Sequence, residues 1–200
     1  MQSENLISPG FADPVFQSQA AFRALLTALS EPGLIQQVAP GFAAPEGLEP
    51  ATAIALLTLA DYETPIWLPA ALRDGPAGAW LRFHCGAALV EEPAQASFAV
   101  IDGAAEAPLL ADFNPGTDQF PDRSTTVLVQ CAGLAGGDIV TLSGPGIAGS
   151  RDIAPIGLRP GFWAEFSANA ELYPLGVDLI LSQGEAVLGL PRSTQIVEVR

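Results

Sequence analysis

The chain has 200 residues, enough for one domain with a sizeable core, and 49% of them are hydrophobic but only 15% are charged, against about 25% charged residues in an average protein. Its formal charge of −14 comes from 22 acidic and 8 basic residues, which argues against binding to nucleic acids or anionic membranes. All the basic residues are arginine, so the chain lacks the lysine that a pyridoxal phosphate Schiff base or a P-loop requires.

The first twelve residues are expected to form a flexible segment. Asp13-Pro14 then has the pattern of an N-cap followed by proline at the first helical position. The helix should end at Pro32-Gly33. One face of it carries apolar residues at positions i, i+3, i+4 and i+7, namely Phe22, Leu25, Leu26 and Leu29. Residues 39–49 are rich in proline and glycine and predict a loop.

The middle of the chain alternates between helical and strand patterns. Residues 50–59 are apolar on nearly every side, which predicts a buried helix, and residues 66–68 predict a short strand. Residues 75–83 predict another helix. Strands are expected at 97–101 and 125–131, with a short helix at 104–113 between them. Such alternation is typical of an α/β sheet with crossover helices, and we expect a three-layer α/β/α sandwich with a mixed sheet.

The last third begins with Gly136-Gly137-Asp138, which predicts a hairpin turn into a strand at 139–142. Residues 162–170 predict the last helix. Two β-rich segments follow at 177–182 and 186–190, joined by a turn at Gln183-Gly184. No repeat or long linker divides the chain, so we expect a single domain over residues 1–200.

The C-terminal hairpin carries the first candidate site. Asp178 and Arg192 flank it and could pair across it or face a common pocket. In a pocket, Arg192 with the hydroxyls of Ser193 and Thr194 would suit a phosphate or phosphonate oxygen. The alternative is a cross-strand salt bridge on a solvent face, which contributes little energy.

Arg82 and His84 form the second candidate site. They share a face on a strand and point about 200° apart on a helix. On one face they could bind a phosphate, with the arginine as a bidentate donor and the histidine as donor or proton shuttle. The alternative is an arginine and a histidine that satisfy the last carbonyls of a helix.

Metal and disulfide chemistry have little support in the sequence. Cys85 and Cys131 are too few for a disulfide framework, and with His84 as the single histidine a zinc site would need carboxylates. We therefore expect reduced thiols and no bound metal.

The first residues lack a secretory signal pattern, and no apolar run reaches the ~20 residues that span a bilayer. We expect a cytoplasmic protein without membrane contact.

Five sequence blocks point to one family. The blocks are Phe22-Arg23 with Ser30-Glu31-Pro32-Gly33, Leu56 to Leu68, Leu81 to His84, Tyr173 to Leu181, and Leu190 to Thr194. Their order and spacing, over residues 15–198, resemble those of the carbon-phosphorus lyase subunit PhnH family of bacterial phosphonate breakdown.

The resemblance implies a fold like a shortened pyridoxal-phosphate-dependent transferase that has lost its cofactor. It also implies a homodimer and a place in a complex with PhnG, PhnI and PhnJ subunits. In that pathway the subunits make an alkylphosphonate ribosyl 5-triphosphate from ATP and a phosphonate. Because the displacement of adenine is attributed to PhnI, this chain is expected to be an accessory subunit, and whether it takes part in catalysis stays open.

The low charge agrees with such a role. A chain with so few charges either buries more of itself than a monomer of this size does or exposes large apolar patches. Composition bias toward alanine and glycine is the alternative explanation for part of it. Two other functions stay open: a nucleotide- or phosphonate-binding protein that uses Arg82, His84 and Arg192, and an independent small-molecule transferase on the same fold.

Overall fold

A seven-stranded mixed sheet forms the centre of the protein in the computed structural model, which describes residues 7–104 and 106–200. Five neighbouring strands pair in parallel, and β9 runs antiparallel to its two neighbours, β8 and β1. The predicted α/β class with a mixed sheet is therefore confirmed. In spatial order the strands are β1 (Ile35–Gln37), β9 (Ala186–Leu190), β8 (Asp178–Gln183), β5 (Thr126–Gln130), β4 (Phe98–Asp102), β2 (Ile66–Trp67) and β3 (Leu89–Val90).

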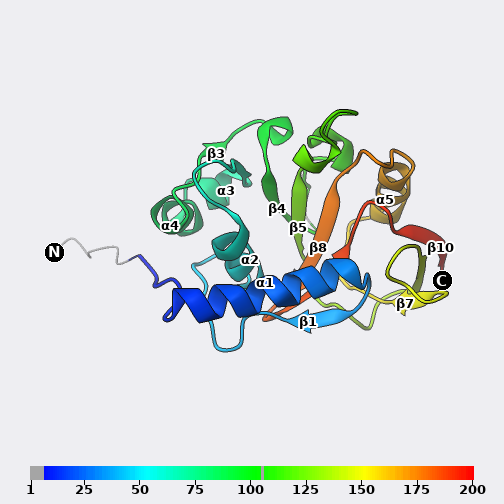
Figure 1. Cartoon of the computed structure of the whole chain (residues 1–200), viewed down its shortest axis with the longest axis horizontal. Coiled ribbons are helices and arrows are strands. Elements are labelled where there is room, and N and C mark those ends of the chain that lie inside the picture. Colours follow the sequence, from blue (N-terminus) through cyan, green and yellow to red (C-terminus); the bar gives the residue numbers. More distant parts are fainter. Residues whose placement is uncertain (1–6, 105) are drawn as a thin grey trace.

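Helices and a second, smaller sheet surround this sheet. In Figure 1, α4 lies toward the N-terminal end of the view, and α5, β7 and β10 lie toward the opposite end. The helices are α1 (Pro14–Ser30), α2 (Pro50–Leu59), α3 (Ala70–Arg73), α4 (Pro76–His84) and α5 (Phe162–Ala170), with short 3-10 turns η1 (Pro93–Gln95), η2 (Leu110–Asp112) and η3 (Pro121–Arg123). The small antiparallel sheet has the order β10 (Gln195–Val199), β6 (Val140–Ser143) and β7 (Arg151–Ile153).

The central strands are buried on both faces, which explains their nearly continuous apolar sequences. On one face Val100, Leu128 and Ile180 pack against α1, α2 and α4. On the other face the apolar core joins the strands to α5 and to the small sheet. The predicted three layers are present. The layer on the second face differs from the predicted layer of helices, because α5 shares that face with the small sheet of β6, β7 and β10.

Helix α1 begins as predicted but presents a different face to the core. The Asp13 carboxylate accepts a hydrogen bond from the Phe16 N–H at 3.3 Å. The residues buried along α1 are Ala21, Leu25 and Ala28. Of the predicted apolar face, Leu25 is buried and Leu29 is partly buried, whereas Phe22 and Leu26 are exposed. The reason lies in the partner strand: a Cβ at Gly189 of β9 would lie 2.4 Å from the Ala28 carbonyl oxygen. A narrow alanine face and a glycine let helix and strand approach closely.

Two further predictions need correction. Over 104–113 the structure describes the turn η2 at Leu110–Asp112 in place of a longer helix, because Pro108 interrupts the segment and Asp112 accepts a hydrogen bond from the Leu109 N–H. The strand after Gly136-Gly137-Asp138 exists as β6, but it pairs with β7 and β10. It cannot form a hairpin with β5, since β4 and β8 occupy both edges of that strand.

The N-terminal segment lies against α4. Residues 1–6 of the stretch expected to be flexible lie outside the described residues. The Ser8 carbonyl accepts a hydrogen bond from Trp80 Nε1 at 2.9 Å, and the ring centroid of Phe11 lies 6.1 Å from that of Phe42. These contacts join the segment to α4 and to the loop 39–49.

The loop 39–49 covers the carboxyl ends of β5 and β8. Gln130 accepts a hydrogen bond from the Glu49 N–H at 2.7 Å and donates one to the Gly47 carbonyl at 3.1 Å. The Glu49 carboxylate accepts from the Gly184 N–H at 2.9 Å. Open α/β sheets usually bind ligands beyond the carboxyl ends of their strands. Here this loop lies there, and the candidate residues Asp178 and Arg192 lie at the opposite, amino ends.

Candidate functional site

Asp178 and Arg192 form an ion pair that is largely withdrawn from solvent. Asp178 begins β8 and Arg192 follows β9, so the hairpin brings them together as the sequence predicts. Arg192 Nε donates to Asp178 Oδ1 at 3.0 Å, and Nη2 donates to Oδ2. The backbone N–H of Arg192 also donates to Oδ1. The side chains are only 13% and 24% exposed, so the pair is not a salt bridge on a solvent face.

The other N–H groups of Arg192 also have acceptors. Nη1 donates to the Pro121 carbonyl at 2.7 Å and reaches the Pro174 carbonyl at 3.5 Å, and Nη2 donates to Ser124 Oγ. A guanidinium has five N–H donors, and each one faces a protein acceptor here. Arg192 thus links the hairpin to the segment before β5 and to the turn before β8. A phosphate would have to displace one of these acceptors.

An open hollow of about 330 Å³ lies beside this pair. Ser193 lines the hollow, whereas Thr194 does not. Thr194 is fully buried, and its hydroxyl has no hydrogen-bond partner among the described residues. The lining residues are Pro121, Asp122, Tyr173, Pro174, Asp178, Pro191, Arg192 and Ser193.

Arg82 and His84 both lie on α4, so they point to different sides of a helix. Arg82 is exposed, and its Nη1 lies 3.4 Å from the Arg73 carbonyl. His84 Nε2 lies 2.9 Å from the Ser8 carbonyl oxygen. The imidazole packs against the rings of Trp80 and Phe83, with its centroid 4.9 Å from the centroid of each. The structure does not bring these two residues onto one face.

The two candidate sites are also far apart in the fold. Arg82 and His84 belong to α4, whereas Arg192 lies between β9 and β10. Figure 1 places α4 and β10 at opposite ends of the molecule. Neither Arg82 nor His84 is among the residues that line the hollow beside Arg192.

Burial keeps the two thiols protonated. It raises the pKa of Cys131 from 9.0 to about 12, and the nearby Asp102 adds to the increase. The pKa of Cys85 rises to about 11 through burial and Asp61. A thiol is a weak nucleophile and ligand until it ionises.

In the described part of the chain, no three His, Cys, Asp or Glu residues are grouped so that they could hold a metal ion. The helices of that part are also too short or too polar to cross a membrane.

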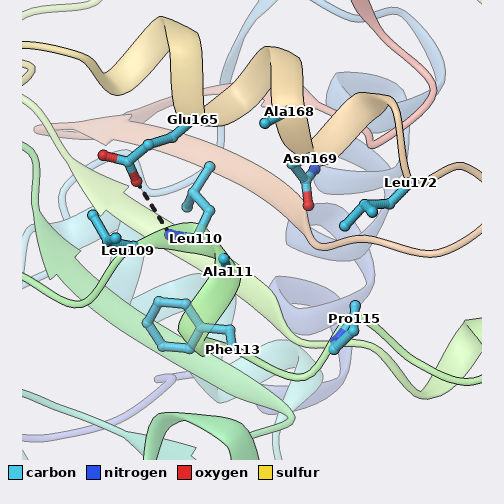
Figure 2. A pocket seen from close by; sticks show the side chains of 9 residues that line it. All are labelled: Leu109, Leu110, Ala111, Phe113, Pro115, Glu165, Ala168, Asn169 and Leu172. Carbon is cyan, nitrogen blue, oxygen red and sulfur yellow. Dashed lines mark hydrogen bonds between the residues drawn. The ribbon is translucent and has the colours of Figure 1, made fainter.

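The structure also reveals an apolar pocket of about 320 Å³ between α5 and the segment around η2. Figure 2 shows Leu109, Leu110 and Phe113 of that segment facing Ala168, Asn169 and Leu172. The other lining residues are Ala111, Pro115 and Glu165. Sequence reasoning missed this pocket because its two walls lie about fifty positions apart in the chain. One signal was present: the pair Leu109-Leu110 follows a proline in a segment that does not form a full helix.

Two polar residues line the pocket, and both have protein partners. The Glu165 carboxylate accepts hydrogen bonds from Arg159 Nη2 at 2.8 Å and from the Leu110 N–H at 3.2 Å. The Asn169 side chain donates to the Val177 carbonyl at 2.9 Å and accepts from the Val177 N–H at 2.8 Å. The pocket therefore offers apolar surface and little free hydrogen-bonding capacity.

Comparison with known proteins identifies the family. The sequence profile of the bacterial phosphonate metabolism protein PhnH matches residues 9–197. The chain belongs to the PhnH family. It is 40% identical over 191 residues, 96% of each chain, to the alpha-D-ribose 1-methylphosphonate 5-triphosphate synthase subunit PhnH of Rhizobium meliloti. It is also 33% identical to the putative C-P lyase subunit HtxG of Stutzerimonas stutzeri, over 90% of this chain and 86% of that one.

Proposed function

We propose that this chain is an accessory subunit of the carbon-phosphorus lyase system, which helps to form an alkylphosphonate ribosyl 5-triphosphate from ATP and a phosphonate. The observation that carries the proposal is the 40% identity, over 96% of both chains, with a relative named as a subunit of that synthase. The geometry supports an accessory role. Arg192, the strongest candidate for binding a phosphate, directs its donors at protein acceptors, and His84 packs between aromatic rings.

The proposed partners are PhnG, PhnI and PhnJ in the cytoplasm, together with a second copy of this chain. Exposed apolar side chains support extensive interfaces. Along α1, Val15 is 73% exposed and Leu26 is 55% exposed, and together with Phe22 they form an apolar stripe on the outside of the helix. A stripe of this kind suits a protein partner, since water contact with it is unfavourable.

We further propose that the fold resembles a shortened pyridoxal-phosphate-dependent transferase that works without the cofactor. The mixed sheet and the absence of any lysine in the chain support this relation. So does the loop 39–49, because Glu49 and Gln130 hold it over the carboxyl ends of the strands, where α/β folds usually bind ligands.

The test is co-purification followed by calorimetry. The tagged chain, recovered from phosphate-starved native cells, should carry PhnG, PhnI and PhnJ in fixed proportion. Titration of the purified chain with ATP, ADP and methylphosphonate should give no heat of binding. Recovery without those subunits would refute the proposal. Heat that disappears in the Arg82→Ala or Arg192→Ala variant would favour the binding-protein alternative, and turnover by the chain alone would favour an independent transferase.

A further inference from the structure

The apolar pocket between α5 and η2 has the features of a preformed binding site. Hydrogen bonds fix both walls. Arg159 and the Leu110 N–H hold Glu165, and the Gly176 N–H donates to the Pro115 carbonyl at 2.9 Å. Asn169 ties the end of α5 to Val177. A site whose walls are already ordered loses little conformational entropy when it is filled.

The rim of the pocket continues its apolar character onto the surface. Leu109 is 52% exposed, Leu172 is 49% exposed and the neighbouring Tyr173 is 64% exposed. Figure 2 shows Leu109 and Leu172 at the two sides of the lining group. An apolar hollow surrounded by exposed leucine and tyrosine is typical of the centre of a protein interface, where one anchoring side chain fills a pocket.

The chemistry of the lining excludes the ligands of the pathway. Glu165 is the one acidic or basic residue among the lining residues, and it is paired with Arg159, which does not itself line the pocket. A nucleotide or phosphonate would bring negative charge into an apolar space beside an acidic residue, which is unfavourable. An aliphatic or aromatic side chain fits such a space and requires no hydrogen bond.

Charge indicates what surrounds that side chain in its own protein. Asp112 and Glu171 adjoin the lining residues Ala111 and Leu172, both acids are exposed, and neither has an ion pair in the described part of the chain. With a formal charge of −14 on the whole chain, positively charged neighbours of the anchor would be favoured.

A second copy of this chain is a poor source of such a segment. Each copy carries a net charge of −14, which opposes the close approach of a second copy to the acidic rim. This chain does place an arginine beside an exposed aromatic residue, at Phe22-Arg23 and at Arg82-Phe83, but it has no lysine. The charge balance therefore favours an occupant from a different protein.

We propose that the pocket between α5 and η2 receives one aliphatic or aromatic side chain from another subunit, on a segment that carries arginine or lysine beside that side chain. The proposal rests on the proposed function, because it requires partner subunits. It assigns the heteromeric contact to a surface separate from the outer stripe of α1, which leaves that stripe available to a second copy of this chain.

The decisive experiment fills the pocket without altering the fold. Ala168 lines the pocket and Ala164 lies one turn earlier on α5 outside it, and both are exposed. The Ala168→Trp and Ala164→Trp variants are therefore matched. Binding to the purified PhnG, PhnI and PhnJ assembly, prepared without this chain, is measured by biolayer interferometry. We expect Ala168→Trp to raise Kd at least about tenfold and Ala164→Trp to change it less than about twofold.

The outcomes separate this inference from the proposed function. If the wild-type chain binds and Ala168→Trp binds equally well, the pocket is not the contact, although the subunit role stands. If the wild-type chain does not bind the assembly, both proposals fail. Unchanged thermal unfolding of the two variants excludes a folding defect as the cause of weaker binding.

Two further measurements test the chemistry of the occupant. A photoreactive side chain at Leu109 should cross-link, in the assembled complex, to a peptide of another subunit with an apolar residue next to arginine or lysine. A cross-link to a second copy of this chain would overturn the assignment.

The charge reversal Glu171→Arg should raise the Kd for the partner assembly several-fold. Glu63 is exposed near the end of α2, and the control variant Glu63→Arg should leave that Kd unchanged. Equal changes of Kd in the two variants would mean that the acidic residues at the rim of the pocket do not contribute to binding.

Discussion

The Asp178–Arg192 pair and the apolar pocket are neighbours, because Leu172 lines the pocket and Tyr173 lines the hollow beside the pair, yet they differ in what they leave available. The pair contains the residue types that most often bind phosphates, but its donors already have acceptors in Pro121 and Ser124. The pocket has no free polar group, but its space is open. The comparison shows that a charged residue indicates a binding site only when some of its hydrogen-bonding capacity remains free.

The first way to test this comparison is to remove Arg192. The Arg192→Ala variant leaves the Asp178 carboxylate largely withdrawn from solvent without its cation, so the free energy of unfolding should fall by about 3 kcal/mol. Urea unfolding followed by circular dichroism measures the change. Arg200→Ala is the control, since the side chain of Arg200 is 50% exposed and its loss should cost less than about 1 kcal/mol. Equal costs would mean that Arg192 is not a structural clamp.

The second test removes the support of the pocket. Arg159 donates to both oxygens of Glu165 and to the Pro108 carbonyl. Arg159→Ala should lower the free energy of unfolding by about 2 kcal/mol, because several hydrogen bonds to charged groups are lost. It should also weaken binding to the partner assembly, since the wall at Leu110 loses its anchor. A variant that is less stable but binds the assembly normally would show that the wall does not depend on this contact.

The sequence predicted the contacts between residues that are close in the chain, but not those between residues that are far apart in it. The pairing of Asp178 with Arg192 follows from one hairpin, so local pattern was enough to bring them together. The acceptors that occupy Arg192 come from Pro121 and Ser124, about seventy positions away, and no local pattern indicated them. The pocket also depends on a long-range contact, between α5 and η2, which lie about fifty positions apart in the chain.

The fold shows the same division. The helices at 50–59 and 162–170 and the C-terminal hairpin follow from apolar periodicity and from turn residues, and they are confirmed. The face of α1 did not follow, because Gly189 on a distant strand decides which side of the helix packs. The pairing of β6 did not follow either, since it depends on which strands occupy the edges of β5.

A third test uses pH. Because burial raises the pKa of Cys131 to about 12 and of Cys85 to about 11, both thiols stay protonated in the folded chain while they ionise above about pH 9 in the unfolded one. Their contribution to stability is therefore complete below pH 9 and is lost as the pH rises toward 11–12. We expect a total loss on the order of 1 kcal/mol by about pH 9.3, which grows as the pH rises further, measured by urea unfolding. The loss should shrink in Cys131→Ala.

The smallest expected effect is the one that separates binding from folding most clearly. Leu172 is 49% exposed at the rim of the pocket, and Leu26 is 55% exposed on α1. Leu172→Ser and Leu26→Ser should each change the free energy of unfolding by no more than about 0.5 kcal/mol, since surface substitutions away from packed or capped positions are nearly neutral. Leu172→Ser should nevertheless weaken binding to the partner assembly, whereas Leu26→Ser should not. If Leu172→Ser instead destabilised the chain by 2 kcal/mol or more, the rim would be part of the core, and the contrast between a saturated polar cluster and an open apolar pocket would no longer hold.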